Sequence, residues 1–246
     1  MINYIKTNKQ FWDDNAFHYE TIHPEHCEPA LHPSWGIRHI PENKLRFITD
    51  TISPGSTIVE VGCGTGHDIL GFSRLGYRSL GFDSSKEMIR NTPSGQGAIF
   101  TQAPAEKLPI PDGSVDAVYS DHGAFDFSPA EPLLAEARRV LRPGGILVIC
   151  TYSSIATICF DESTKQTSDY LRRPYKPQRI QTDGKIVVFN YSEDRWISMA
   201  TAAGFKINRL ELPLAEKSDN QYFSESPSVE WSTMWPAEQM WVFERY

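Results

Sequence analysis

Three glycines at alternate positions form the segment of this sequence with the most informative chemistry. Gly62, Gly64 and Gly66 follow a β-branched run at 57–61 that predicts a strand, and they precede a predicted helix at 67–75. Glycine permits positive φ and lets a ligand approach the backbone, so this unit predicts a ligand-binding turn. The spacing is G-x-G-x-G, which differs from the G-x-G-x-x-G of dinucleotide-binding enzymes.

Two acidic residues near this turn narrow the choice of ligand. Asp83 ends the next predicted strand, where a carboxylate can accept hydrogen bonds from both hydroxyls of a ribose. Glu60 lies just before the first glycine, and its charge would repel a pyrophosphate and attract an ammonium group. The residues therefore predict a nucleoside ligand that also carries a cationic amine.

Four blocks extend this pattern along the chain: VEVGCGTG at 59–66, GFDSS at 81–85, AEKLPIPDGSVDAVYS at 105–120 and EARRVLRPGGILVI at 136–149. With these blocks the sequence resembles the class I S-adenosylmethionine (SAM) dependent methyltransferases. It is most similar to the small-molecule branch typified by ubiquinone and menaquinone C-methyltransferases. The resemblance runs from Phe11 to about Leu212 and implies a SAM cofactor and a small-molecule acceptor. An NAD-binding Rossmann domain is the less favoured alternative.

The resemblance also implies which residues bind the cofactor. The three glycines would pass under the methionine part of SAM, Asp83 would bind the ribose, and Tyr19 of the segment FWDDNAFHYE would lie over the cofactor. Contacts around the adenine and the methionine end would come from Ser84, Met88, Ala105, Glu106, Ser120 and Asp121. Pro104 stands where the family often has an aspartate, so the usual recognition of the adenine amino group is not expected here.

Catalysis requires an aligned nucleophile and in some cases a base. His122 follows Asp121 at the expected carboxyl edge of the sheet. Both are candidate catalytic residues, with His122 as the general base; a histidine that only shapes the pocket is the alternative. Tyr19 would contact the sulfonium through its electron-rich face, or pack as a core aromatic. The stretch 120–123 carries neither the Asp/Asn-Pro-Pro-Tyr signature of DNA amino-methyltransferases nor the Pro-Cys of cytosine C5 enzymes, so those acceptors are not expected.

The segment at 153–192 interrupts the strand–helix pattern and is predicted to form a lid. Its cations would bind a carboxylate or phosphate of the substrate, or would remain solvated on a loop. They are Lys165, Arg172, Arg173, Lys176, Arg179 and Lys185. Further along, Trp231, Trp235 and Trp241 would line an apolar acceptor pocket, form a dimer contact or pack the last strand.

The elements that must position these residues alternate between strand and helix. Strands are expected at 57–61, 77–82, 97–101, 114–120, 146–151, 205–212 and 239–244. Helices are expected at 10–21, 42–52, 67–75, 84–91, 129–141 and 193–203. This alternation predicts an α/β, Rossmann-like, doubly wound sheet with right-handed crossovers. The resemblance implies seven strands, the last of them antiparallel.

One methyltransferase domain is expected over the whole chain, residues 1–246. Its parts would be an N-terminal helical cap at 1–52, a SAM-binding core at 53–152, the lid insertion after the fifth strand at 153–192, and the C-terminal part of the sheet at 193–246. The length and the content of 40% hydrophobic residues suit a domain with its own core.

Charge and cysteine content narrow the partners and the compartment. The net charge of -7 disfavours nucleic acid as a partner of the whole surface. The sequence shows no apolar run of membrane-spanning length and no secretion signal. The four cysteines form no CxxC pair, which favours reduced thiols and a cytoplasmic location.

A metal site is not expected, although histidines are concentrated near the N-terminus. Prolines interrupt any regular face that would gather them as ligands. These histidines are His18, His23, His26, His32 and His39. Three other functions stay open: aminocarboxypropyl transfer or cyclisation that releases methylthioadenosine, RNA methylation, and non-catalytic SAM binding. The oligomeric state stays open as well.

Overall fold

The computed structural model describes residues 3–22, 32–95, 97–175, 178–182, 185–219 and 227–246, with the backbone alone at 19–22 and 178–182. Three residues with predicted roles lie outside the described residues: His23, His26 and Lys176. One of the four cysteines, Cys27, lies outside them as well. The side chains of Tyr19 and Arg179 lie outside them too, although the backbone of both is placed.

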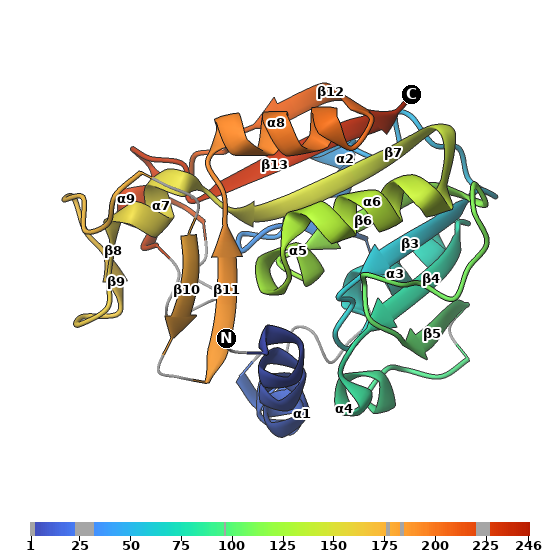
Figure 1. The fold of residues 1–246 in the computed structure, drawn as a ribbon, viewed down its shortest axis with the longest axis horizontal. Coiled ribbons are helices and arrows are strands. Elements are labelled where there is room, and N and C mark those ends of the chain that lie inside the picture. Colours follow the sequence, from blue (N-terminus) through green and yellow to red (C-terminus); the bar gives the residue numbers. More distant parts are fainter. Residues whose placement is uncertain (1–2, 23–31, 96, 176–177, 183–184, 220–226) are drawn as a thin grey trace.

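A seven-stranded sheet forms the centre of the molecule, in the order β12-β13-β7-β6-β3-β4-β5 (Figure 1). Its strands are β3 (Thr57–Val61), β4 (Arg78–Asp83), β5 (Ala98–Gln102), β6 (Val115–Asp121), β7 (Leu141–Tyr152), β12 (Phe205–Glu211) and β13 (Glu238–Arg245). The five strands from β3 to β7 are parallel, and β13 runs antiparallel to both β7 and β12. The expected doubly wound sheet with an antiparallel last strand is confirmed.

Helices cover both faces of this sheet (Figure 1). The helices that follow β3 to β6 are α3 (His67–Arg74), α4 (Lys86–Arg90), α5 (Ala124–Phe127) and α6 (Ala130–Val140), and α8 (Glu193–Ala202) precedes β12. The core cluster on one face includes residues of α6 and α8, and the cluster on the other includes residues of α3. Residues 146–150 of β7 are at most 1% exposed, as expected for a strand covered on both faces.

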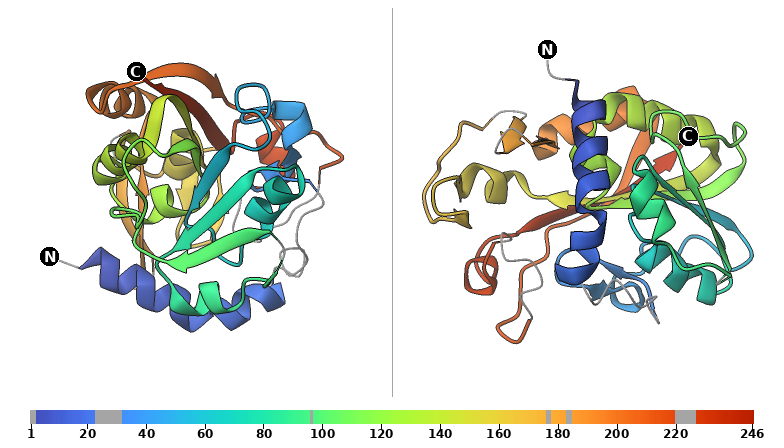
Figure 2. Two further views of the ribbon diagram at one scale, coloured as in Figure 1. Left: turned by 90° about the vertical axis from the view of Figure 1, so that its right-hand side faces the viewer. Right: turned by 90° about the horizontal axis from the view of Figure 1, so that it is seen from below.

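The N-terminal helix α1 (Tyr4–Ile22) begins earlier than the expected helix at 10–21. It lies between β11 (Ile186–Asn190) and α4, across one end of the sheet (Figure 2). Asn8 fixes it at one point, since its side-chain amide donates to the carbonyls of Phe127 (2.7 Å) and Val187 (2.8 Å) and accepts from the N–H of Val187 (2.8 Å). Asp13 fixes it at another, by accepting from the hydroxyl of Ser85 at 2.7 Å.

The helix expected at 42–52 is wrong for most of its length. Helix α2 covers only Glu42–Leu45, and Arg46 turns into the left-handed region with φ 56°. The buried carboxylate of Glu42 accepts hydrogen bonds from the N–H groups of Phe47 (3.2 Å), Ile48 (2.9 Å) and Thr49 (2.8 Å). The Glu42 side chain therefore accepts hydrogen bonds that the backbone carbonyls of a continuing helix would otherwise accept. The chain continues as turns.

The segment before α2 and the segment after β7 both form small hairpins. β1 (Ser34–Trp35) pairs with β2 (Ile40–Pro41). After β7 come α7 (Ser154–Cys159), β8 (Phe160–Asp161), β9 (Gln166–Thr167) and β10 (Gln178–Thr182), and then β11. β8 pairs with β9 and β10 pairs with β11, both antiparallel. The predicted lid region thus contains two hairpins and a short helix.

The three C-terminal tryptophans separate in the structure. Trp241 of β13 is 1% exposed in the core and stacks on Phe243. Trp231, in α9 (Val229–Ser232), is buried against α7 and donates to the carbonyl of Ser168 at 3.2 Å. Trp235 is 47% exposed. Among the helices that the structure describes, none has the length and apolar character needed to cross a membrane.

Candidate active site

A cavity of about 650 Å³ opens at the carboxyl ends of the parallel strands. It lies at the point where the strand order changes direction. From β3 the order runs to β4 and β5 on one side, and to β6 and β7 on the other. Such crevices are the usual ligand sites of open α/β sheets, and the volume is in the range of small-molecule pockets. Its walls come from α1, the β1–β2 hairpin, the glycine turn, the ends of β4, β6 and β7, and the lid hairpins.

The three glycines of the turn have different structural roles. All have positive φ, at 76°, 52° and 84° for Gly62, Gly64 and Gly66. A Cβ on Gly64 would meet nothing within 4 Å, so this residue presents an open backbone to the cavity that it lines. A Cβ on Gly62 would lie 2.4 Å from the backbone N of Ala124, and one on Gly66 would lie 2.3 Å from the Phe100 ring. Gly66 serves packing and does not line the cavity.

Asp83 stands at the end of β4 and lines the cavity. Its two oxygens accept from the backbone N–H of Gly64 at 3.0 Å and from that of Ser85 at 2.8 Å. Burial raises the pKa of this carboxyl, and these hydrogen bonds act in the opposite direction. The carboxylate is therefore held in a fixed orientation beside the glycine turn.

Three further carboxylates line the same end of the cavity: Glu60, Asp68 and Asp121. Burial, together with the negative charge of Asp68, raises the pKa of Glu60 well above its usual value, although the Tyr119 hydroxyl donates to it at 3.1 Å. Burial raises the pKa of Asp121 to about 7, with His122 opposing and Asp68 adding to the shift. This crowding of buried carboxylates favours a bound cation.

Asp121 has one oxygen whose partner is not among the described residues. Its Oδ2 accepts from the backbone N–H of Gly36 at 2.7 Å. Its Oδ1 is buried and accepts no hydrogen bond from the described part of the chain. A buried acceptor without a donor is costly, so this atom is suited to a donor on a ligand.

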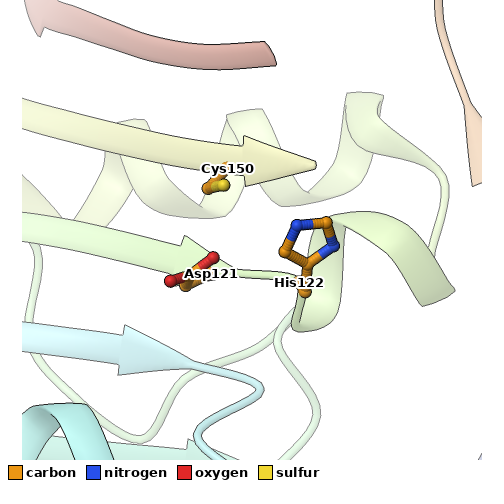
Figure 3. Close-up of side chains that lie close together, drawn as sticks. All are labelled: Asp121, His122 and Cys150. Atoms are coloured by element: carbon orange, nitrogen blue, oxygen red, sulfur yellow. The ribbon is translucent and has the colours of Figure 1, made fainter. Parts of the chain in front are cut away.

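His122 lies directly after β6, with φ 44° (Figure 3). Its Nδ1 is 3.1 Å from Oδ2 of Asp126, and its Nε2 is 2.7 Å from Oε1 of Glu238. Burial lowers the pKa of this histidine, but its hydrogen bonds with Asp126 and Glu238 outweigh burial and raise the pKa well above its usual value. Because both ring nitrogens already face carboxylates, the ring is poorly arranged to take a proton from an acceptor.

The side chains of Asp121, His122 and Cys150 also lie close enough to suggest metal ligands, with donor atoms within 4.8 Å of one another (Figure 3). Glu238, however, already bonds two of them, because its Oε1 faces His122 and accepts from the Cys150 thiol at 3.5 Å. Burial raises the pKa of that thiol well above its usual value, which disfavours the thiolate that a metal requires. The geometry is that of a hydrogen-bonded cluster.

The lid places two lysines on the opposite wall of the cavity, Lys165 and Lys185. Apolar residues surround them there, among them Phe160 of β8 and Ile186 of β11. Lys165 also forms an ion pair with Glu162 at 3.5 Å. The predicted cations Arg172 and Arg173 do not line the cavity and pair with Asp161 and Glu162. The cavity is therefore acidic on its sheet side and basic on its lid side.

Most of the sequence-predicted site residues come together in this cavity. Those that line it are Glu60, Gly62, Gly64, Asp83, Ser84, Met88, Ala105, Glu106, Asp121 and His122. Ser120 is fully buried beneath the turn and does not line it. Its Oγ, like Oδ1 of Asp121, is buried without a hydrogen-bond partner among the described residues. The contacts of Ser120, Gly66 and Tyr19 with the cofactor stay predictions, and the side chain of Tyr19 lies outside the described residues.

The structure adds residues to the site that the sequence patterns do not indicate: Asp68, Asp126, Glu238 and the hairpin residues Gly36 and Ile37. Asp68 lies one residue after His67, at the start of α3, so the turn itself could have indicated it. Glu238 and the hairpin are brought to the site by sheet register and long-range packing. No local pattern marks such residues.

The comparisons with known proteins agree with this geometry. The family described as "Methyltransferase domain" matches residues 59–149, which span the glycine turn, Asp83, Asp121 and His122. The crystal structure of an S-adenosylmethionine dependent methyltransferase from Mesorhizobium loti superposes with a TM-score of 0.61 at 19% identity, over 82% of this chain and 96% of that one.

The family match covers residues 59–149, and the structural likeness, at 19% identity, shows a shared fold. A solved N1-methyltransferase from Burkholderia thailandensis with the same fold (TM-score 0.56, 12% identity, 81% of this chain and 75% of that one) contains bound S-adenosylhomocysteine. Two curated relatives are similar to this chain in sequence: 2-methyl-6-phytyl-1,4-hydroquinone methyltransferase of Synechocystis (34% identical, 42% of this chain, 34% of the relative) and demethylmenaquinone methyltransferase of Tropheryma whipplei (33% identical, 42% and 44%). The chain thus spans well under two thirds of the length of these two relatives.

The cavity fits SAM on two structural grounds. The orphan Oδ1 of Asp121, beside Glu60 and Asp68, suits the ammonium group of the methionine part. The open backbone of Gly64, hydrogen-bonded to Asp83, leaves room for the nucleoside to pass close to the turn.

Proposed function

We propose that this protein transfers the methyl group of SAM to a small organic acceptor. The observation that carries the proposal is the polarity of the cavity, whose sheet wall presents fixed carboxylates and an open glycine turn. Such a wall suits a ligand that combines a ribose with a cationic amine. The similarity to two quinone-type methyltransferases supports a small-molecule acceptor.

We infer the following contacts for the cofactor. Gly62 and Gly64 lie under its methionine part, Glu60 and Asp121 accept from its ammonium group, and Asp83 accepts from its ribose hydroxyls. The adenine contacts, all from residues that line the cavity, are Ser84, Met88, Ala105 and Glu106. Bound SAM supplies an activated methyl group on its sulfonium.

The protein's contribution to the chemistry is then mainly alignment and exclusion of water. Helix α1, which Asn8 and Asp13 fix in place, covers the cavity and carries Tyr19, which we retain as a candidate contact of the sulfonium. His122 is better suited to shape the pocket than to act as a base, since both of its nitrogens face carboxylates. An acceptor that is already ionised would need no base.

An anionic, partly apolar acceptor suits the lid wall. Lys165 and Lys185 offer cationic groups there, while Phe160, Ile186 and Val188 offer apolar surface. The buried thiols Cys63, Cys150 and Cys159 are free, which supports a reducing, cytoplasmic location as part of the proposal.

A product assay tests this function. The protein is incubated with SAM alone and with a fractionated extract of small metabolites, and the by-product is identified by mass spectrometry. We expect S-adenosylhomocysteine (SAH) that appears only with an extract fraction. Methylthioadenosine would instead indicate use of the aminocarboxypropyl group, and turnover only with added RNA would contradict a small-molecule acceptor.

A further inference from the structure

Glu238 begins β13 with a carboxylate that is only 1% exposed. Its Oε1 lies 2.7 Å from Nε2 of His122, 2.8 Å from the backbone N of Ile37 and 3.5 Å from Sγ of Cys150. Three segments far apart in sequence therefore meet on one carboxylate oxygen. Hydrogen-bond donors of this kind replace the water that a carboxylate loses on burial.

The far side of the His122 ring is held in the same way. Asp126, 3% exposed in α5, lies 3.1 Å from Nδ1. The other titratable groups that face the ring are Asp121 and Cys150, and the ring packs against Tyr152 with centroids 4.7 Å apart. With carboxylates at both nitrogens, the arrangement favours a protonated imidazole.

The backbone that carries His122 touches the glycine turn directly. A Cβ on Gly62 would lie 2.4 Å from N of Ala124, and a Cβ on Gly123 would lie 2.7 Å from O of Gly62. His122 itself has φ 44°, a left-handed conformation that a non-glycine residue keeps only when its surroundings hold it there. A shift of the His122 ring would therefore shift the turn beneath the cofactor.

The same carboxylate also holds the β1–β2 hairpin against the cavity. Ile37 donates its N–H to Glu238, and a Cβ on Gly36 would lie 2.3 Å from Oε1 of Glu238. The N–H of Gly36 donates to Oδ2 of Asp121, which leaves Oδ1 of that residue for a ligand. Gly36 and Ile37 both line the cavity.

We propose that Glu238 is a positioning residue of the cofactor site, although it does not line the cavity. Its carboxylate holds the His122 ring at Nε2 and the hairpin backbone at the N–H of Ile37. Through these two contacts it fixes the position of the residues around the methionine part of the cofactor. The part of this inference that concerns the cofactor rests on the proposed function, whereas the contacts to His122 and Ile37 stand independently of it.

The variant Glu238→Gln tests this inference, because the amide is nearly isosteric and still accepts from Ile37. Two quantities are measured across pH: the titration of the His122 ring by NMR, and the affinity for SAH by calorimetry. We expect the pKa of His122 to fall toward its usual value. We also expect SAH affinity to drop by roughly tenfold or more, and further as the ring loses its proton.

Glu136→Gln is the matched control. Glu136 is also a buried glutamate, 8% exposed, which accepts from the backbone N of Leu108 and pairs with Arg139, but it does not line or contact the cavity. We expect this variant to leave both SAH affinity and the His122 titration within twofold of the unmodified protein.

Two results would overturn the inference: an unchanged His122 titration in Glu238→Gln, or SAH affinity within twofold of the unmodified protein across pH. If Glu238→Gln does not fold, Glu238→Asp withdraws the carboxylate from Nε2 of His122 and from the N–H of Ile37 and is held to the same expectations. If the unmodified protein binds no SAH, the proposed function fails separately, while the titration still decides whether Glu238 controls the state of His122.

Discussion

The two walls of the cavity are built in different ways. On the sheet wall, the carboxylates of Asp83 and Asp121 are oriented by backbone N–H groups from neighbouring segments. On the lid wall, Lys165 and Lys185 extend from short hairpins, and the side chain of Lys165 is 37% exposed. Preorganised groups suit a ligand that is always the same, and long flexible cations suit one defined mainly by its charge.

The largest expected effect comes from breaking the sheet wall itself. Gly62→Ala would place a Cβ 2.4 Å from the backbone of Ala124 at φ 76°, so we expect a loss of about 3 kcal/mol in the free energy of unfolding. Gly55→Ala, at φ 89° with nothing within 4 Å, isolates the backbone strain and should cost only about 1 kcal/mol. Urea denaturation compares them, and equal losses would refute the close contact.

The next effect concerns the cofactor alone. Asp83→Ala removes a charged acceptor at the cavity and should weaken SAH binding by about a hundredfold, measured by calorimetry. Asp116→Ala is its matched control. Asp116 is also a buried carboxylate that accepts a hydrogen bond from a backbone N–H, that of Thr57 at 2.6 Å, but it does not line the cavity. We expect that control to lower stability and leave affinity unchanged; equal losses of affinity would contradict the assignment of Asp83.

A smaller effect should separate the lid wall from the sheet wall. Lys185→Gln should raise the KM for an anionic acceptor by about tenfold while the Kd for SAH stays the same. Lys206→Gln is the control: Lys206 lies on β12 and pairs with Glu244 of β13, and its substitution should change neither value. Steady-state kinetics with the acceptor found in the product assay give the answer. If Lys185→Gln changed the Kd for SAH and left the KM for the acceptor unchanged, the assignment of Lys185 to the acceptor would be contradicted.

The smallest effect is a pH dependence of cofactor binding. The pKa of Asp121 is about 7, raised by burial, so the folded protein holds a proton there at pH values where the unfolded chain has lost it. This carboxyl therefore contributes stability at low pH that is lost as the pH rises through about 7. The affinity for SAH should change in the opposite sense and increase several-fold between pH 6 and 8. Asp121→Asn should remove that increase, and an unchanged slope would exclude Asp121 as the partner of the ammonium group.

Sequence patterns predicted the sheet wall because its signals are local. The strand at 57–61 was expected with the same bounds that β3 has, and Asp83 was placed at the carboxyl end of the second strand, where β4 ends. Glycines, alternation and strand ends all act over a few residues, so one sequence contains them. The prediction of a helix at 42–52 was wrong because the Glu42 side chain accepts hydrogen bonds from backbone N–H groups that helical carbonyls would otherwise accept.

The rest of the site depends on contacts between distant segments. Glu238 reaches His122 only because β13 pairs antiparallel with β7, which in turn lies beside β6. The hairpin residue Gly36 reaches Asp121 across the same edge of the sheet. The role predicted for His122 as a base is disfavoured for the same reason, since its two partners come from α5 and from the last strand.

Calorimetric titration of the purified protein with SAH tests whether this cavity binds the cofactor. We predict a single site with a dissociation constant in the micromolar range, lost in Asp83→Ala and retained in Asp116→Ala. No heat of binding at millimolar SAH, from protein shown to be folded, would contradict the assignment of this cavity to S-adenosylmethionine.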